Sequence, residues 1–429
     1  MMDKEKTRPF GPADILLPKS ANMTKWSVIA CDQHTSEPEY WERVDAFIGE
    51  EPSTLRLMLP EHLYHSGSLP ELIDKTGHAM DTYLDTGVFH TIPDTYIYVE
   101  RTLYSGKVRR GIVGQIDLEC YDHSDKNGAL IRSTEGIVKE KMPPRIRLRE
   151  GARAELTHVL VLVDDPECML IEPLTEMKQE ADKLYDFSLM ENGGHICGYK
   201  VNKKGRESIE KAIDTFLDFD HFRSRYGFDN EPILLFATGD GNHSLATAKA
   251  CWEKMKPNLT DRERQNHPAR FALVEIVNIR DQALEFEPIN RVVFDCDPEH
   301  LLGALLKFYP GSKIGMDEGH NISFSCCGTA DVLTIPADTA PLAIGALGNF
   351  LDWYLERHPG KLDFVHGDDV VIRLSRKKNT IGFVLPAVDK SMFFASIIRG
   401  GAMPRKTFSM GSARDKRYYL EMRKLEKTE

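Results

Sequence analysis

The sequence lacks any long hydrophobic run. No apolar stretch in its 429 residues approaches the roughly 20 residues that a membrane-spanning helix needs. The opening segment, MMDKEKTRPF, also lacks the apolar core of a signal peptide. Both absences predict a cytoplasmic protein that has no membrane partner.

Positive charge is in deficit. Lysine and arginine together number 55 against 66 aspartates and glutamates, which gives a formal net charge of −11. Nucleic acids and anionic membranes are themselves negative and would be repelled by such a surface. The expected partners are therefore small molecules, with no nucleic acid.

Paired cysteines are missing. The eight cysteines include no CxxC pair, and the only close groupings are His195-Ile196-Cys197 and Cys326-Cys327. Neither grouping has a second ligand pair at zinc-finger spacing. Reduced thiols are predicted, rather than a disulfide framework or a structural zinc site.

The common nucleotide-binding signatures are absent as well. There is no GxxxxGK[ST] loop and no glycine-rich kinase loop, which disfavours the usual nucleotide folds. Strand-like and helix-like segments interleave along the whole chain, and this predicts a mixed α/β (α+β) fold. From about residue 295 short predicted strands alternate with helices, and we therefore expect an α/β core over 1–294 and a smaller α/β segment over 295–429.

Hydrophobic periodicity predicts the main elements. Strands are expected at 26–30, 95–100, 111–118, 158–163, 233–237, 271–278, 322–324, 332–335, 370–374 and 381–385, with an extended pair over 284–294. Helices are expected at 174–185, 207–219 and 341–355, after an N-cap at Ser36, and from Ser412 onward.

The most informative stretch is 231–252, EPILLFATGDGNHSLATAKACW. An apolar strand leads into a glycine-flanked polar turn and then into a helical pattern. Glycines let a backbone approach a ligand closely, and the first N–H groups of a helix have no intrahelical partner, so the turn predicts an anion site. Its members are Gly239, Asp240, Gly241, Asn242, His243 and Ser244. An ordinary tight connection with a satisfied aspartate is the alternative.

Three further stretches carry polar side chains of the same kind. Asp32 and His34 follow the strand at 26–30, where α/β proteins often place ligand-facing groups, although simple capping of the next helix fits as well. Arg145 and Arg147 alternate after a double proline, which predicts an extended arm with both side chains on one side, or else a solvated charge run. The loop 400–411 places Lys406 and Thr407 beside Arg405 and Ser409, as a second anion cradle or an ordinary basic loop.

Several motifs together identify a family resemblance. They are ACDQHTSEPEYW (30–41), IRSTEG (131–136), PPRIRLRE (143–150), GDGNHS (239–244), HPARFALVEIVN (267–278), EPINRVV (287–293) and PRKTFSMG (404–411). Over essentially its whole length the chain resembles the bacterial family known as domain of unknown function 1015. That family usually has Asp-Gly-His-His-Arg at the central motif and histidine at position 290, where this chain has Asn242, Ser244 and Asn290.

The Asp-Gly-x-His signature is similar to the phosphate-binding motif of the ParB/sulfiredoxin-like superfamily. That superfamily includes CTP-using partition proteins, sulfiredoxin and kinases of free serine. The resemblance implies a core of that fold and a kinase that uses ATP or ADP and Mg²⁺ on L-serine, or the reverse reaction on phosphoserine. A metal-dependent small-molecule phosphatase and a ParB-like nucleotide-binding regulatory protein without turnover are the alternatives.

Phosphoryl transfer needs donors around the phosphate oxygens, cations, and a base near the acceptor hydroxyl, and each residue above receives an expected role. Phosphate would be held by Gly239, Gly241, Asn242, His243 and Ser244. Asp240 would bind Mg²⁺ or accept the hydroxyl proton, with Glu135 as a second base. The substrate would be bound by Arg145, Arg147, Asp32 and His34, and the nucleotide pocket would be completed by Lys406 and Thr407.

Overall fold

The computed structural model describes residues 8–124, 128–387, 389–403 and 406–426. The chain divides into two compact units. The first unit comprises 1–133, 137–284 and 411–429, and the second comprises 134–136 and 285–410. The division lies about ten residues before the expected position, and the last segment of the chain returns to the first unit instead of completing the second.

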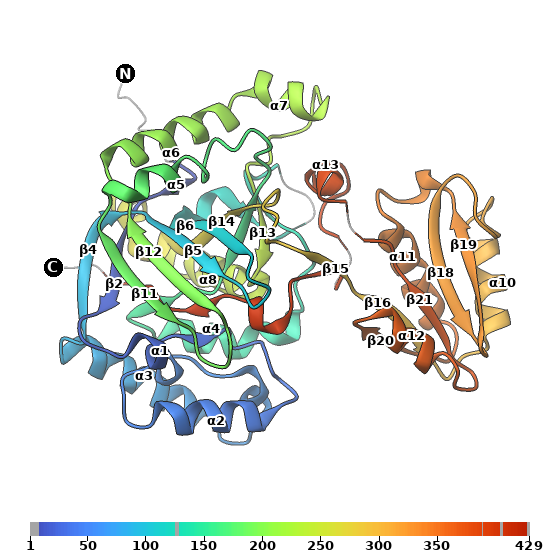
Figure 1. The fold of residues 1–429 in the computed structure, drawn as a ribbon, viewed down its shortest axis with the longest axis horizontal. Helices are drawn as coiled ribbons and strands as arrows, with labels where there is room; N and C mark the ends of the chain where they lie inside the picture. The colour runs from blue at the N-terminus through green and yellow to red at the C-terminus, as the bar shows by residue number, and fades with distance from the viewer. Residues whose placement is uncertain (1–7, 125–127, 388, 404–405, 427–429) are drawn as a thin grey trace. The chain divides into compact units, whose positions relative to one another are not determined.

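A ten-stranded mixed sheet is the centre of the first unit (Figure 1). Its strand order is β11-β12-β5-β6-β14-β10-β13-β8-β7, and β1 also pairs with β6. The strands are β1 (Phe10–Gly11), β5 (Ile97–Thr102), β6 (Val108–Asp117), β7 (Tyr121–Asp122), β8 (Ile131–Ser133), β10 (Leu160–Val163), β11 (Lys183–Ser188), β12 (His195–Lys200), β13 (Phe236–Asp240) and β14 (Phe271–Asn278).

Both faces of this sheet are buried. In β14, Ala272, Val274 and Ile276 join one hydrophobic core, whereas Leu273 joins the other, as the two-residue period of a strand requires. Helices α6 (Lys203–Phe216) and α8 (Asn242–Met255) contribute to the first core. The second contains α2 (Pro38–Ile48) and the two-stranded sheet of β3 (Val28–Ile29) and β23 (Tyr418–Tyr419).

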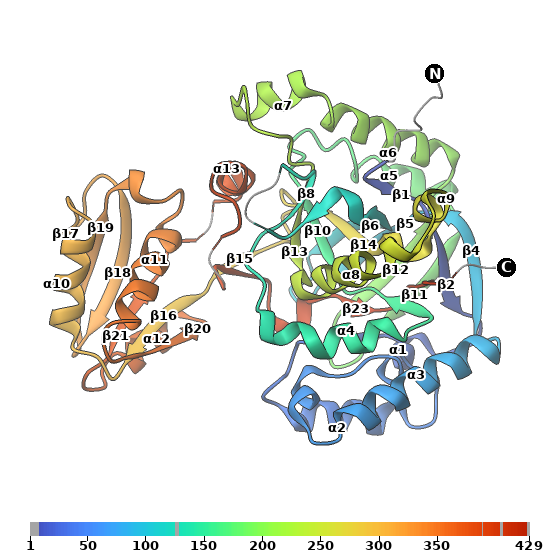
Figure 2. The same cartoon turned by 180° about the vertical axis from the view of Figure 1, so that it is seen from behind.

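The remaining elements of the first unit surround these cores. A four-stranded sheet has the order β4 (Phe89–Thr95), β2 (Ala13–Pro18), β24 (Met422–Lys424), β9 (Ala154–Leu156). The other α-helices are α1 (Met23–Trp26), α3 (Leu69–Asp85), α4 (Met142–Glu150), α5 (Leu174–Met177), α7 (Phe219–Tyr226) and α9 (Asp261–Asn266). Helix α4 packs along α8 (Figure 2).

The second unit has its own six-stranded sheet and core. The order is β17 (Lys313–Ile314), β19 (Thr329–Ile335), β18 (His320–Cys326), β21 (Ile381–Val384), β16 (Asn290–Phe294), β20 (Lys361–Val365), and β15 (Phe286–Pro288) pairs separately with β22 (Phe408–Met410). Its α-helices are α10 (Pro298–Phe308), α11 (Ala343–Leu355), α12 (Asp368–Leu374) and α13 (Lys390–Gly400).

The mixed α/β class is confirmed, but several local predictions are wrong. Residues 370–374 lie in α12 rather than in a strand, and the helix predicted over 174–185 ends in a 3-10 turn at Glu180, before β11. The helix predicted from Ser412 is a 3-10 turn followed by β23 and β24. Short apolar or charged runs fit either period, and in each case pairing with a distant strand or packing of a short helix decided the outcome.

No helix among the described residues has the length and apolar character needed to span a membrane.

Candidate active site at the start of helix α8

The polar turn lies where β13 meets α8. The strand is placed at 236–240 rather than at 233–237, because Asp240 still pairs with Leu160 of β10 and Thr238 with Ser133 of β8. Gly239 and Asp240 therefore belong to the strand. Gly241 follows in the left-handed region (φ 78°), and α8 begins at Asn242. The Gly241 N–H donates to the Asp240 carboxylate at 3.0 Å, and the Ser133 hydroxyl donates to the Asn242 side-chain oxygen at 2.8 Å.

Gly241→Ala is expected to lower the free energy of unfolding by about 1–3 kcal/mol. An added methyl group would meet Val159 Cγ2 at 3.0 Å on a backbone whose positive φ already disfavours alanine. Urea unfolding measures the loss. Gly77→Ala in α3 is the matched control, since nothing lies within 4 Å of that position, and it should be neutral or stabilising. Equal effects of the two substitutions would contradict this account of the turn.

The antiparallel pairing of β10 and β13 brings a further histidine to the turn. Because the start of β10 lies beside the end of β13, His158, two residues before β10, comes close to the first turn of α8. Its Nε2 lies 3.2 Å from the Ser244 hydroxyl. The ring also packs edge-on against Tyr419, with a centroid distance of 5.0 Å.

Asp32, His158, Asp240, Ser244 and Lys416 form one group, called here the polar cluster. Lys416 Nζ lies 3.4 Å from Asp240 Oδ2, and their side chains are 11% and 19% exposed. The charges of Asp32 and Asp240 both act on His158, and that of Lys416 acts on Asp32. The cluster therefore combines two carboxylates, an imidazole, a hydroxyl and an ammonium group.

The ionisation states within the polar cluster follow from burial and neighbouring charge. Burial lowers the pKa of His158, although the carboxylates of Asp32 and Asp240 oppose this shift, so the ring is neutral near pH 7. Burial raises the pKa of Asp32, but the hydrogen bond from the Gln33 amide and the positive charges of Lys416 and Arg145 favour the carboxylate more, and the pKa lies below its usual range. The pair therefore offers a charged carboxylate beside a neutral imidazole that can accept a proton.

His243 is held in one neutral form. The Val138 N–H donates to its Nε2 at 3.0 Å, which places the ring proton on Nδ1. Burial, together with the positive charges of Arg145 and Lys141, lowers the pKa of His243 to about 4. Only Nδ1–H is then able to donate to a phosphate oxygen, and the ring brings no positive charge at neutral pH.

The lowered pKa of His243 makes stability depend on pH in a defined direction. Between pH 6.5 and about 4 the unfolded chain binds a proton at this histidine that the folded chain does not, so stability falls as the pH falls through this window. When the pH is lowered from 7.5 to 5, we expect the free energy of unfolding of His243→Gln to fall by about 1–2 kcal/mol less than that of the parent, after allowance for solvent screening.

Urea unfolding at the two pH values measures this difference. His90→Gln, at an exposed strand position, is the control and should follow the parent. An unchanged pH dependence in His243→Gln would show that His243 is not the group responsible.

The predicted arginine arm is wrong in its geometry. Residues 142–150 form α4, in which positions 145 and 147 point in different directions, because residues two positions apart are rotated by about 200° about the axis of an α-helix. Arg145 is buried, donates to Glu61 Oε2 at 2.7 Å and lies over the Tyr64 ring, and its charge acts on Asp32, His158 and His243. Arg147 is exposed, and the prolines open a helix instead of extending the chain.

His34 contacts neighbouring residues of its own segment and does not join Asp32 in the polar cluster. Its Nδ1 lies 3.1 Å from Glu37 Oε1, and its ring stacks on Tyr40 with a centroid distance of 3.8 Å. The helix that follows begins at Pro38 after an N-cap at Glu37, so Ser36 is not the cap. Of the two side chains predicted to face a ligand here, the structure brings Asp32 into the polar cluster and gives His34 local partners.

Glu135, Lys406 and Thr407 meet within the second unit. The Thr407 N–H donates to Glu135 Oε1 at 3.1 Å, and Arg291 donates to the Lys406 carbonyl at 2.9 Å. The Lys406 ammonium and the Arg291 guanidinium each lie 4.5 Å from the Phe364 ring centre. Burial lowers the pKa of Arg291 to about 10. Arg405, predicted as part of the same cradle, lies outside the described residues.

A cavity of about 160 Å³ in the first unit adjoins the polar cluster. Its wall includes His158 and Ser244 together with Arg145, and apolar side chains such as Met58 and Met80 form much of the rest. A larger cavity of about 630 Å³ is lined by none of the five cluster residues. The smaller cavity can therefore hold a small ligand against His158 and Ser244 of the cluster.

Sequence reasoning missed His158 and Lys416. The apolar pattern predicts His158 within a buried strand, and only the pairing with β13 reveals that it lies just before the strand begins. Lys416 was placed in a charged helix, whereas it precedes β23 and reaches Asp240 from a segment 176 positions away in the sequence. No local pattern signals either contact, although a histidine directly before an apolar run is a usable hint.

Comparison with known proteins identifies one matching family model and several solved structures of low similarity. The model of the family described as "Protein of unknown function (DUF1015)" matches residues 12–424. No curated protein matches the chain. Among solved structures, a free serine kinase in complex with AMP is 11% identical with a TM-score of 0.37, over 74% of this chain and 93% of that one, and a mutant of that kinase is recorded with ADP.

Two further solved structures are similar at the same level. A conserved hypothetical protein from Pyrococcus furiosus is 11% identical, with a TM-score of 0.36 over 74% of this chain and 97% of that one. SbnI from Staphylococcus aureus, with a C-terminal truncation, is 8% identical, with a TM-score of 0.36 over 70% and 83%.

Proposed function

The chain belongs to the family of proteins of unknown function DUF1015, and from that starting point we propose that it is a small-molecule phosphotransferase, a kinase that uses ATP or ADP to phosphorylate L-serine. The serine assignment rests on the similarity of the Asp-Gly-x-His motif to that of the ParB/sulfiredoxin-like superfamily. The class of reaction rests on the side chains around the start of α8.

The observation that carries the proposal is the polar cluster itself. An ammonium, Lys416, and a carboxylate, Asp240, lie 3.4 Å apart beside the N-terminus of a 14-residue helix, with His158 and Asp32 next to them. A helix N-terminus and a cation favour phosphate oxygens, while a carboxylate and a neutral imidazole can accept a proton. Transfer of a phosphoryl group to a hydroxyl needs both capacities in one place.

The proposed step moves one phosphoryl group. The serine hydroxyl oxygen forms a bond to the terminal phosphorus of the nucleotide, and the bond from that phosphorus to the bridging oxygen breaks. The hydroxyl proton passes to Asp240 or to His158, and the shortened nucleotide leaves with the electron pair of the broken bond. Lys416, the N–H groups of residues 242–244 and Nδ1–H of His243 bind the non-bridging oxygens.

A magnesium ion fits the donors that are available. Mg²⁺ prefers oxygen ligands and is usually held by one or two carboxylates together with substrate phosphates, and Asp240 and Asp32 are the carboxylates here. The ion would neutralise charge on the phosphates when it is bound. The expected roles of Glu135, Lys406 and Thr407, which meet within the second unit, are tested separately by Glu135→Gln and Thr407→Val.

The test is a product assay. Purified protein is incubated with Mg²⁺, ATP or ADP, and L-serine or phosphoserine, and the products are followed by mass spectrometry. Phosphoserine formed from serine, with loss of one phosphoryl group from the nucleotide, supports the proposal. Release of inorganic phosphate from phosphoserine without a nucleotide acceptor would indicate a phosphatase. Nucleotide binding with no turnover of any small hydroxyl compound would indicate a binding protein, and either result overturns the kinase assignment.

A further inference from the structure

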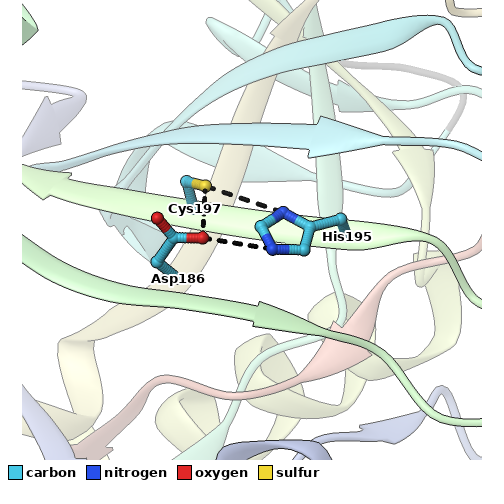
Figure 3. Close-up of side chains that lie close together, drawn as sticks. All are labelled: Asp186, His195 and Cys197. Atoms are coloured by element: carbon cyan, nitrogen blue, oxygen red, sulfur yellow. Dashed lines mark hydrogen bonds and ion pairs between the residues drawn. The ribbon is translucent and has the colours of Figure 1, made fainter.

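The hairpin of β11 and β12 places three metal-binding side chain types on one face. Asp186 of β11 pairs directly with Cys197 of β12, and His195 lies two residues before Cys197, on the same side of its strand. Figure 3 shows the three side chains pointing toward one another. They come from the outermost pair of strands of the main sheet, which belongs entirely to the first unit.

Three short distances join the group, and the two that involve His195 use different ring nitrogens, of which one would bind an ion. Asp186 Oδ1 lies 3.1 Å from His195 Nε2 and 3.2 Å from Cys197 Sγ, and Cys197 Sγ lies 3.7 Å from His195 Nδ1. Zinc bonds of about 2.0–2.3 Å in a tetrahedron separate neighbouring ligand atoms by about 3.3–3.8 Å. One ligand atom from each residue lies within 4.8 Å of the others, so small side-chain movements are enough to surround an ion.

A second carboxylate lies in the same row. Glu100 of β5 pairs with Cys197 on the opposite side of β12 from Asp186, and residues paired across strands share a face. Its oxygens are engaged by the Tyr98 hydroxyl at 2.9 Å and by Lys178 Nζ at 2.6 Å. Lys183 Nζ lies 2.5 Å from Asp186 Oδ2. In the metal-free protein, lysine ammonium groups therefore neutralise the two carboxylates that flank Cys197.

We propose that Asp186, His195 and Cys197 bind one divalent transition-metal ion of the zinc class, with the fourth position open to water or to Glu100. A thiolate and an imidazole beside a carboxylate select zinc, cobalt or nickel over magnesium and calcium, which prefer oxygen alone. The Asp186 and His195 side chains are 39% and 40% exposed, so an ion can enter from solvent. This site involves none of the residues of the proposed phosphotransfer reaction.

Metal binding would also change the protonation of Cys197. Burial and the hydrogen bond to Asp186 raise the pKa of the Cys197 thiol to about 11, so the thiol is protonated in the metal-free protein. Binding then releases this proton and displaces the Lys183 ammonium from Asp186. Both events can be followed without any assay of enzymatic activity.

Titration of the purified full chain with Co²⁺, followed by absorbance, tests the proposal. One equivalent of Co²⁺ is expected to produce a thiolate-to-cobalt charge-transfer band and visible bands of tetrahedral cobalt, and Zn²⁺ should abolish them. Cys197→Ser is expected to remove the charge-transfer band, and both Cys197→Ser and His195→Ala should weaken binding by more than about tenfold. Cys327→Ser, which alters an exposed thiol elsewhere, is the matched control and should bind like the parent.

Lys183→Met gives a test in the opposite direction. Removal of the competing ammonium is expected to tighten Co²⁺ binding several-fold, and this variant keeps all three ligands. Circular dichroism checks that each variant is folded. The assignment is overturned if the parent gives no thiolate band, if the band depends on Cys327 instead of Cys197, or if Lys183→Met binds no more tightly than the parent.

Discussion

Replacement of Asp240 by asparagine is expected to reduce phosphoryl transfer by about two to four orders of magnitude while the fold is retained. Asparagine has the shape of aspartate and can still accept the hydrogen bond from the Gly241 N–H. It cannot, however, accept a proton, and it removes the negative charge that faces Lys416 at 3.4 Å. The measurement is the initial rate of phosphoserine formation at saturating nucleotide and serine.

A matched control separates chemistry from general charge effects. Asp261, in α9, has a side chain that is 96% exposed, and Asp261→Asn should leave the rate unchanged. Equal unfolding midpoints for Asp240→Asn and the parent would show that the loss is not one of structure. If Asp240→Asn is fully active, Asp240 takes no part in the reaction. If phosphoryl transfer is lost in His158→Gln instead, the imidazole of His158 is the base.

Arg417→Met is expected to lower the free energy of unfolding by about 3–5 kcal/mol, the largest stability effect that we predict. Arg417 lies between two buried carboxylates, 2.7 Å from Glu275 Oε2 and 2.6 Å from Glu421 Oε2, and all three side chains are at most 4% exposed. Methionine fills much of the volume but leaves both carboxylates without this cation. Urea unfolding at pH 8 measures the loss.

The same variant has a pH signature. Without Arg417 the two carboxylates ionise less readily inside the protein, so the deficit relative to the parent should be larger at pH 8 than at pH 5, where they can bind protons. Arg357→Met, at a side chain that is 49% exposed and paired with Glu356, is the control and should change stability by less than about 0.5 kcal/mol. A small effect of Arg417→Met would show that the buried network contributes little to stability.

Elements with one dominant pattern could be predicted from the sequence. The strand FALVEIVN is predicted at 271–278 and lies there, because a mostly apolar run rich in β-branched residues and buried on both faces has few alternatives. The helix over 341–355 begins at Ala343 and ends at Leu355, since its apolar residues recur at helical spacing. The turn at Gly241 was also identified, because glycine marks the positive φ there, although Gly239 and Asp240 lie in β13 and not in the turn.

Features that depend on distant segments could not be predicted. The stretch from Ser412 onward is rich in charge and is predicted from its sequence as a charged helix. Arg417 and Glu421 are instead buried, because Glu275, far away in the sequence, completes their ion pairs. The segment 143–149 shows alternation but is a helix, because Arg145 is buried in contact with Glu61. Likewise the metal-site proposal needs Asp186, which no spacing rule links to His195 and Cys197.

The order in which the chain is synthesised gives the return of 411–429 to the first unit a further meaning. Strand β24 lies between β2 and β9, strands from much earlier in the chain, and Lys416 and Arg417 are supplied only after the whole second unit has been made. A nascent chain that lacks this segment has neither the ammonium that faces Asp240 nor the guanidinium of Arg417, which together with Arg109 neutralises Glu275. Translation products that end before this segment are therefore expected to be less stable than the full chain and, under the proposed function, unreactive.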